Sequence, residues 1–221
     1  MRSLSRPSAL ALYEAALLGE DGGELEPLHA VGDDGSRRPV PLRRWLRRPG
    51  RGEEELLARV EGPVLDIGCG AGRHVVALRQ RGMEAVGVEV SPRAAALARE
   101  RGARVVEGSI FEVDLPARWA SALLLDGNIG IGGDPRALLR TVADLLRPGG
   151  SVLVELEPPR TCSTLRHVRL EAARQRSAWI PWSVVAADEI EAISLAAGMR
   201  PEEEWSAENR WFARLREAGS R

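Results

Sequence analysis

The residues best suited to chemistry lie in one short stretch, Val64-Leu-Asp-Ile-Gly-Cys-Gly-Ala-Gly-Arg-His74. Asp66 is followed by three glycines at alternate positions, Gly68, Gly70 and Gly72. Because glycine has no Cβ, the backbone can turn sharply there and approach a ligand closely. A helix that starts after such a turn points its free N–H groups and the positive end of its dipole into the turn. The stretch can therefore hold a nucleotide or the carboxylate of an amino acid.

The elements around this turn predict an open α/β sheet. The apolar run from Pro63 to Ile67 indicates a strand buried on both faces, and a helix is expected to start near Arg73. Further strands are expected over 85–90, 104–107, 120–125 and 151–156, further helices over 91–101, 134–147 and 186–197, and a closing hairpin over 200–205 and 210–215. This alternation predicts a Rossmann-like, doubly wound seven-stranded α/β sheet, mostly parallel with one antiparallel strand.

Two segments interrupt the alternation. A short amphipathic helix is expected over 8–18, and residues 24–52 are expected to be irregular apart from a possible short helix over 42–48. Arginines cluster within 24–52, and they either attract an anionic ligand or form a solvated face balanced by Glu53, Glu54 and Glu55. Residues 157–183 are longer than a connection between a strand and the next helix needs to be. Such a long connection is typical of a functional insertion.

Polar residues follow several of the expected strands at one edge of the sheet. Ligands of open α/β sheets bind at the carboxyl ends of the strands, beside the first strand. The residues expected to converge there are Asp66–Gly72, Glu89, Ser109–Ile110 and Asp126–Asn128.

The combination of Asp66-x-Gly-x-Gly-x-Gly72, Glu89 at the end of the next strand and Arg147-Pro-Gly-Gly150 resembles the class I S-adenosylmethionine-dependent methyltransferases. The resemblance runs from about Val60 to the C-terminus. A dinucleotide-binding Rossmann domain is the nearest rival, but its fingerprint places a glycine or alanine where this chain has Arg73.

The resemblance implies S-adenosylmethionine as cofactor, with Glu89 on the ribose hydroxyls and Asp66 on the methionine ammonium. Val90 and Ile110 are expected to cover the adenine, and Ser109 replaces the aspartate that many members have there. The implied cofactor-binding residues are Asp66, Gly68, Cys69, Gly70, Gly72, Glu89, Val90, Ser109, Ile110, Asp126, Gly127 and Asn128. The resemblance also implies an N-terminal lid over residues 1–55, followed by a cofactor-binding domain over 56–221. Tyr13 is then either a contact of the lid with the cofactor or a packing residue.

The expected function is methyl transfer to the oxygen, nitrogen or carbon of a small molecule, within a pocket built by residues 157–183. His167 and Asp126 are the catalytic candidates, and Asn128, Glu155 and Glu157 could also approach the methyl acceptor. Trp179 and Trp182 offer flat faces to a ring. The alternative is a protein that binds S-adenosylmethionine without transferring its methyl group.

The overall composition limits the kinds of binding partner that we expect. The 221 residues carry a net charge of −1, so neither nucleic acid nor an anionic membrane is favoured as a partner. DNA amino-methylases carry an Asn/Asp-Pro-Pro-aromatic tetrapeptide where this chain has Asp126-Gly-Asn-Ile129. The two cysteines are too few and too far apart for a disulfide framework, and no metal site is expected. We expect a cytoplasmic protein, either a monomer or a homodimer.

Overall fold

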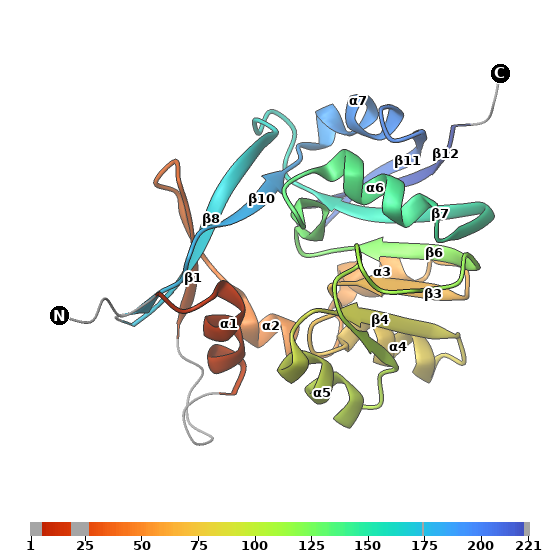
Figure 1. The fold of residues 1–221 in the computed structure, drawn as a ribbon. Coiled ribbons are helices and arrows are strands. Elements are labelled where there is room, and N and C mark those ends of the chain that lie inside the picture. Colours follow the sequence, from red (N-terminus) through yellow and green to blue (C-terminus); the bar gives the residue numbers. More distant parts are fainter. Residues whose placement is uncertain (1–5, 19–26, 174, 219–221) are drawn as a thin grey trace.

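A computed structural model describes residues 6–18, 27–173 and 175–218. Its main sheet has seven strands in the order β11-β12-β7-β6-β3-β4-β5 (Figure 1). These are β3 Val64–Ile67, β4 Ala85–Glu89, β5 Val105–Glu107, β6 Trp119–Leu124, β7 Leu146–Leu156, β11 Met199–Ala207 and β12 Arg210–Glu217. The pairs from β7 to β5 are parallel, whereas β12 is antiparallel to both β7 and β11. The predicted sheet with one antiparallel strand is confirmed.

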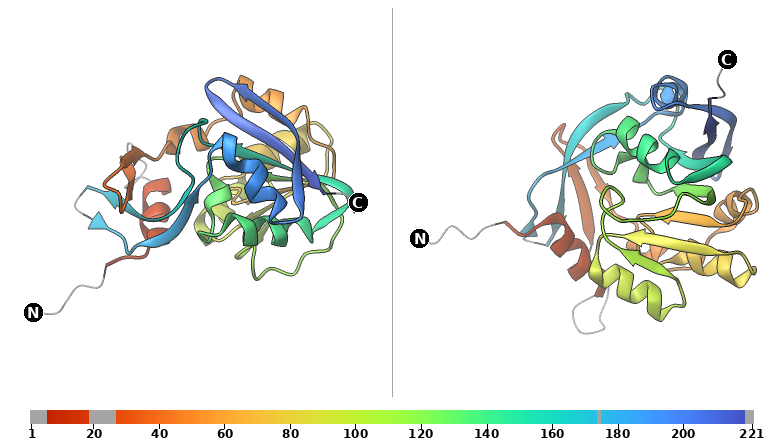
Figure 2. Two further views of the ribbon diagram at one scale, coloured as in Figure 1. Left: turned by 90° about the horizontal axis from the view of Figure 1, so that it is seen from above. Right: turned by 45° about the vertical axis from the view of Figure 1, so that its right-hand side comes forward.

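Helices cover both faces of this sheet (Figure 2). They are α3 Arg51–Leu57, α4 Arg73–Gln80, α5 Pro92–Glu100, α6 Pro135–Ala143 and α7 Ile190–Leu195, with 3₁₀ turns at Asn128–Gly130 and Ala187–Glu189. Neighbouring residues of a strand enter different cores, because side chains alternate between its faces. Leu65 and Ile67 pack with α6 and α7, whereas Val64 packs with α3 and α4. The apolar run of β3 is therefore buried on both sides, as its composition predicts.

Local capping explains where two of these helices begin. Ser91 accepts a hydrogen bond from the N–H of Ala94 at 3.0 Å, and Asp134 accepts from Arg136 and Ala137. A proline follows each cap at the first helical position, where its missing N–H costs nothing. One boundary differs from expectation. Helix α6 ends at Ala143, so Arg147-Pro-Gly-Gly150 lies within the first half of β7.

Parts of the two segments expected to be irregular or inserted, 24–52 and 157–183, belong to a second, antiparallel sheet. Its order is β10-β8-β1-β2, with β9 also pairing with β8. The strands are β1 Leu28–Gly32, β2 Arg37–Pro39, β8 Thr164–Ala172, β9 Gln175–Arg176 and β10 Ile180–Val184. The expectation of an irregular segment over 24–52 is thus wrong for residues 28–39. Their strand partner lies far along the chain, where Ala30 faces Leu170, so no local pattern reveals it.

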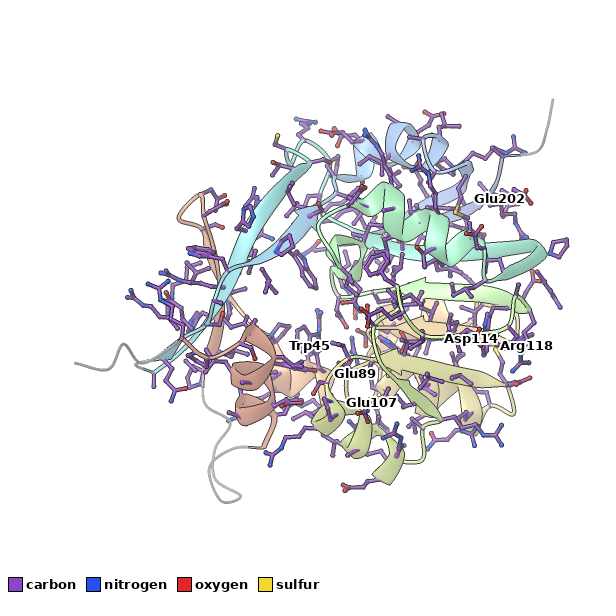
Figure 3. All side chains as sticks on the ribbon, viewed as in Figure 1. Trp45, Glu89, Glu107, Asp114, Arg118 and Glu202 are labelled. Carbon is purple, nitrogen blue, oxygen red and sulfur yellow. The ribbon has the colours of Figure 1, made fainter. Side chains whose placement is uncertain are left out.

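The small sheet stands beside the end of the main sheet that carries the glycine turn (Figures 1 and 2). Helices α1 Ala9–Leu18 and α2 Leu42–Trp45 join it through a separate apolar core that includes Leu12, Leu28, Leu42 and Ala172. Figure 3 shows Trp45 and Glu89 toward this side, with Arg118 and Glu202 at the opposite end of the main sheet. No helix in the described part of the chain is long and apolar enough to cross a membrane.

Candidate functional site

The glycine turn joins β3 to α4 and has the backbone shape that its glycines allow. Gly68, Gly70 and Gly72 all have left-handed φ angles, of 67°, 54° and 75°. The N–H groups of Gly68 and Cys69 donate to the carbonyl of Val88 on β4. The turn is thereby fixed against the neighbouring strand, with the start of α4 directly behind it.

Asn128 closes the turn from the other side. Its Nδ2 donates to the carbonyl oxygens of Ile67 at 2.8 Å and Gly68 at 3.1 Å. A Cβ on Gly68 would lie 2.7 Å from that nitrogen, so only glycine permits this approach. Asn128 therefore holds the backbone of the turn in place, and the Gly68 carbonyl already accepts a hydrogen bond from it.

Glu89 ends β4 beside the turn. Its Oε2 accepts from the N–H of Gly70 and its Oε1 from the N–H of Ser91, both at 2.8 Å. Burial raises the pKa of Glu89, although these two hydrogen bonds oppose the shift. Each oxygen keeps a further lone pair, so the carboxylate can still accept from two adjacent hydroxyls.

Asp66 lies beneath the turn and is almost completely buried. Its Oδ2 has no hydrogen-bond partner among the described residues and lies 3.5 Å from Nδ1 of His74. A buried carboxylate oxygen without a donor is costly, so a ligand that supplies an N–H group fits this position.

The remaining residues expected to bind cofactor surround the turn. Val90 is 53% exposed and can cover an apolar ring, whereas Ile110 is buried beside the main core. The Oγ of Ser109 accepts a long hydrogen bond from the N–H of Phe111, at 3.3 Å. Cys69 is buried in the core between β3, β4 and α4, and burial raises the pKa of its thiol, so it serves as a packing residue.

Helix α1 covers the turn from the N-terminal segment. The hydroxyl of Tyr13 lies 3.3 Å from the place where a Cβ on Gly70 would stand. Burial raises the pKa of this hydroxyl, and Glu89 adds to the shift, so Tyr13 stays neutral. Glu14 accepts hydrogen bonds from the Ser91 hydroxyl at 2.8 Å and from the N–H of Arg93 at 3.4 Å. These contacts attach α1 to the start of α5, next to Glu89.

Asp126 is part of an ion network. Its Oδ2 accepts from Arg73 at 2.6 Å, and its Oδ1 accepts from Arg44. Arg210 connects Asp126, Glu155 and Glu53. Burial alone would raise the pKa of Asp126, but the arginines, Arg73 foremost, hold it below its usual value. A saturated carboxylate with a lowered pKa is a poor base, so the structure argues against the predicted catalytic role of Asp126.

Glu53 was missed as a site residue. The sequence placed it on a solvated face, but its side chain is 3% exposed and accepts from Arg73 at 2.6 Å and Arg210 at 2.8 Å. It also accepts from the N–H of Gly50 at 3.0 Å, which caps the start of α3 with one half of a capping box. The Glu three residues after Gly50 was the available signal for this role.

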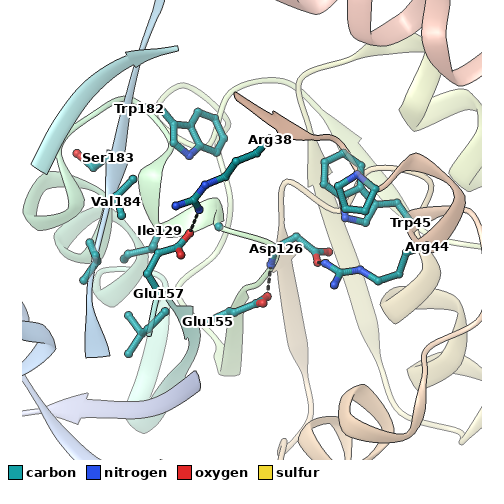
Figure 4. Close-up of a pocket in the computed structure, with 14 residues that line it drawn as sticks. Arg38, Arg44, Trp45, Asp126, Ile129, Glu155, Glu157, Trp182, Ser183 and Val184 are labelled. Atoms are coloured by element: carbon teal, nitrogen blue, oxygen red, sulfur yellow. Dashed lines mark hydrogen bonds and ion pairs between the residues drawn. The ribbon is translucent and has the colours of Figure 1, made fainter. Parts of the chain in front are cut away.

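A cavity of about 300 Å³ lies between the small sheet and the ends of β6 and β7 (Figure 4). Its walls come from both interruptions of the main fold, since Arg38, Arg44 and Trp45 belong to the N-terminal segment and Trp182 to β10. Asp126, Glu155 and Glu157 complete the polar lining. The cavity adjoins the glycine turn through Asp126 and Gly127, which precede Asn128.

The structure does not bring His167 to this cavity. Residues opposite each other in an antiparallel pair share a face, so Trp182 shares a face of the small sheet with Arg166, and His167 shares the other face with Pro181. His167 is exposed and lies beside Asp33, with 3.4 Å between Nδ1 and Oδ2. His167 therefore does not line this cavity, and its catalytic role stays a prediction. Trp179 lies with His167 and Asp33, away from the cavity.

Comparison with known proteins identifies the class. Residues 64–150 match the model of a methyltransferase domain. The main sheet and the small sheet both fall within the match to an S-adenosylmethionine-dependent methyltransferase from Bacteroides fragilis, solved with S-adenosyl-L-homocysteine. That match has a TM-score of 0.80 at 21% identity and covers 96% of this chain and 97% of the other. The fold is therefore the Rossmann-like methyltransferase fold.

Curated relatives agree in family. A ubiquinone biosynthesis O-methyltransferase from Ruegeria pomeroyi is 27% identical over 88% of this chain and 83% of its own length. One of the same name from Leptothrix cholodnii is also 27% identical, over 59% of this chain. This chain spans about half the length of that relative and of a similar one from Bordetella avium. Residues 64–150 thus match a methyltransferase domain, and the curated proteins that the chain resembles are methyltransferases.

Proposed function

We propose that this protein transfers a methyl group from S-adenosylmethionine to a small molecule. The observation that carries the proposal is the glycine turn together with two buried carboxylates that differ in their hydrogen-bond partners. Glu89 has two lone-pair positions left beside the turn, and Asp66 has a buried oxygen without a donor among the described residues. An adjacent pair of ribose hydroxyls suits the first and an ammonium suits the second.

Each part of the cofactor then has a residue to hold it. Glu89 accepts from the ribose hydroxyls, Asp66 accepts from the methionine ammonium, and Val90 with Ile110 covers the adenine. S-adenosylmethionine supplies an electrophilic methyl group on a sulfonium. What the chain contributes is alignment of the methyl acceptor and exclusion of water.

The N-terminal segment and the 157–183 segment supply that exclusion in our proposal. Residues 1–55 act as a lid, because α1 lies over Gly70 and α2 contributes Arg44 and Trp45 to the cavity. Residues 157–183 complete the pocket for the methyl acceptor through Glu157 and Trp182. A cavity of about 300 Å³ suits a small molecule, at the lower end of ligand-pocket volumes.

Calorimetry with the purified protein tests the cofactor directly. We expect binding of S-adenosylmethionine and S-adenosylhomocysteine and no binding of nicotinamide dinucleotides. Glu89→Ala should weaken binding by roughly 1.5–3 kcal/mol, the usual scale for hydrogen bonds to a charged group.

Glu107→Ala is the matched control for that variant. Glu107 is the register partner of Glu89 on the neighbouring strand β5, but it is exposed and pairs only with Arg99 among the described residues. Its removal should leave cofactor affinity unchanged. Binding of NAD, or an affinity that Glu89→Ala does not alter, would contradict the proposal.

A further inference from the structure

Charged side chains of both signs line the cavity. Three carboxylates face it, from Asp126, Glu155 and Glu157, and two guanidinium groups, from Arg38 and Arg44. Both arginines are about half exposed, so water screens their charge. Asp126 and Glu155 are also paired with Arg73 and Arg210, so Glu157, whose partner among the described residues is the half-exposed Arg38, is the carboxylate best able to attract a cation.

Only one of these carboxylates has a free oxygen among the described residues. Both oxygens of Glu155 accept from Arg210 at 2.7 Å, and one of them also accepts from the N–H of Asp126. Each oxygen of Asp126 accepts from an arginine. In Glu157, Oε1 accepts from Arg38 at 2.7 Å and Oε2 accepts from no described residue (Figure 4).

Glu157 is also held firmly in place. Its N–H donates to the carbonyl of Val185 at 2.9 Å, and its own carbonyl accepts from the N–H of Ala187 at 3.0 Å. Its side chain is 33% exposed, which is partly open to a ligand and not fully solvated. Trp182 on β10 and Trp45 on α2 line the same cavity, and the face of an indole ring attracts a cation.

We propose that Glu157 makes this cavity selective for methyl acceptors that carry a protonated amine beside a ring. The ammonium donates to Oε2 of Glu157 and passes a proton to that oxygen, which leaves a neutral amine whose lone pair can accept the methyl group, and the ring lies against the tryptophans. This proposal rests on the proposed function and narrows it to nitrogen as the atom methylated. An anionic methyl acceptor would be repelled by the three carboxylates. It would find no unpaired arginine in the described lining, because Arg38 is paired with Glu157 and Arg44 with Asp126.

The test uses three probes of similar size that differ in charge: benzylamine, benzyl alcohol and benzoate. Each is titrated by calorimetry at neutral pH into the protein with and without saturating S-adenosylhomocysteine. We expect benzylamine to bind at least about tenfold more tightly than the other two, as a charge-assisted hydrogen bond implies. Equal affinity for the three probes would overturn the proposal.

Variants separate the carboxylate from its surroundings. Glu157→Gln should abolish the preference for benzylamine while S-adenosylhomocysteine affinity changes less than about twofold. Arg38→Met removes the partner but keeps the carboxylate, so the preference should persist or increase. Glu171→Gln, on the outer face of the small sheet beside Arg37 and Arg169, should change nothing.

The outcomes distinguish the two proposals. A protein that binds S-adenosylhomocysteine but keeps its amine preference in Glu157→Gln retains the proposed function and refutes the role of Glu157. A protein that binds no S-adenosylhomocysteine refutes the proposed function, and the titration without it still decides the amine preference. Efficient methylation of a hydroxyl by a protein indifferent to benzylamine would also refute selectivity for amines.

Discussion

Gly70 combines a left-handed backbone with close contact to another element. An alanine there is strained at φ 54°, and its Cβ would stand 3.3 Å from the Tyr13 hydroxyl. Gly82 has φ 77° as well, but a Cβ there meets nothing within 4 Å. The two positions thus share the backbone cost, roughly 1–2 kcal/mol for an L-residue, and differ in what the new methyl group touches.

We predict that Gly70→Ala and Gly82→Ala lower the free energy of unfolding by similar amounts, and that only Gly70→Ala impairs cofactor binding. The reason is that the added methyl group lies where α1 and the turn meet a ligand. Chemical denaturation measures the first quantity and calorimetry with S-adenosylhomocysteine the second. Equal loss of affinity in both variants would show that the effect is one of stability alone.

Two aspartates at the same end of the sheet show how environment separates similar residues. Asp66 lies within the buried strand β3 and Asp126 follows the buried strand β6, and the sequence assigned both to the ligand. Asp126 is surrounded by arginines that hold its pKa low, whereas Asp66 has an oxygen without a donor among the described residues. The partners of Asp126 come from Arg44, Arg73 and Arg210, which are far apart in the chain, so spacing could not distinguish the two.

At the scale of elements, the small sheet joins two segments that sequence analysis treated separately. Strand β1 pairs along β8 from Leu28 with Ala172 to Gly32 with Val168. The N-terminal segment and the 157–183 segment therefore share one sheet. A deletion of residues 1–48 removes a strand partner as well as a cover, because β8 would become an edge strand.

We predict that the protein lacking residues 1–48 keeps a folded main sheet but loses amide protection over residues 168–172, which pair with β1, and transfers methyl poorly. Hydrogen exchange measures the first effect, and strands β3 and β6 serve as the internal control because their partners remain. Unchanged protection in β8 together with undiminished turnover would mean that the N-terminal segment is only packed against the site.

At the scale of the whole molecule, the ion network connects the N-terminal segment to four parts of the main fold. Glu53 lies on α3, Arg73 on α4, Asp126 after β6, Glu155 on β7 and Arg210 on β12. The pairs are mostly buried, and removing one member of a buried pair leaves the other charge uncompensated. The network should therefore contribute to global stability and to its dependence on pH.

Glu53 gives the sign of that dependence. Burial acts to raise its pKa, but Arg73, the Gly50 N–H and Arg210 lower it below the ordinary value of 4.5. A carboxyl group with a lower pKa in the folded state stabilises the protein above its unfolded pKa. That contribution is lost as pH falls through the folded pKa.

We predict that Glu53→Gln lowers the free energy of unfolding at neutral pH by roughly 3 kcal/mol. The difference from the parent protein should shrink as pH falls below about 4.5, since Glu53 itself becomes neutral there. Urea titrations across pH measure both effects. Glu55→Gln, an exposed residue paired with Arg51, should stay within about 0.5 kcal/mol of the parent. A difference that is constant with pH would exclude the ionic explanation.

The sequence by itself determined the main sheet and the glycine turn, because their signals are local. Buried apolar runs, Ser91-Pro92 and Asp134-Pro135 caps and the alternate glycines act within a few residues of one another. The tertiary structure alone decided the small sheet, the ion network and the cavity, whose contacts join residues up to 157 positions apart. Strand register also decided which face each side chain takes. A shift of one residue in the pairing of β8 would exchange its two faces, so the sequence could not tell that His167 points away from the cavity.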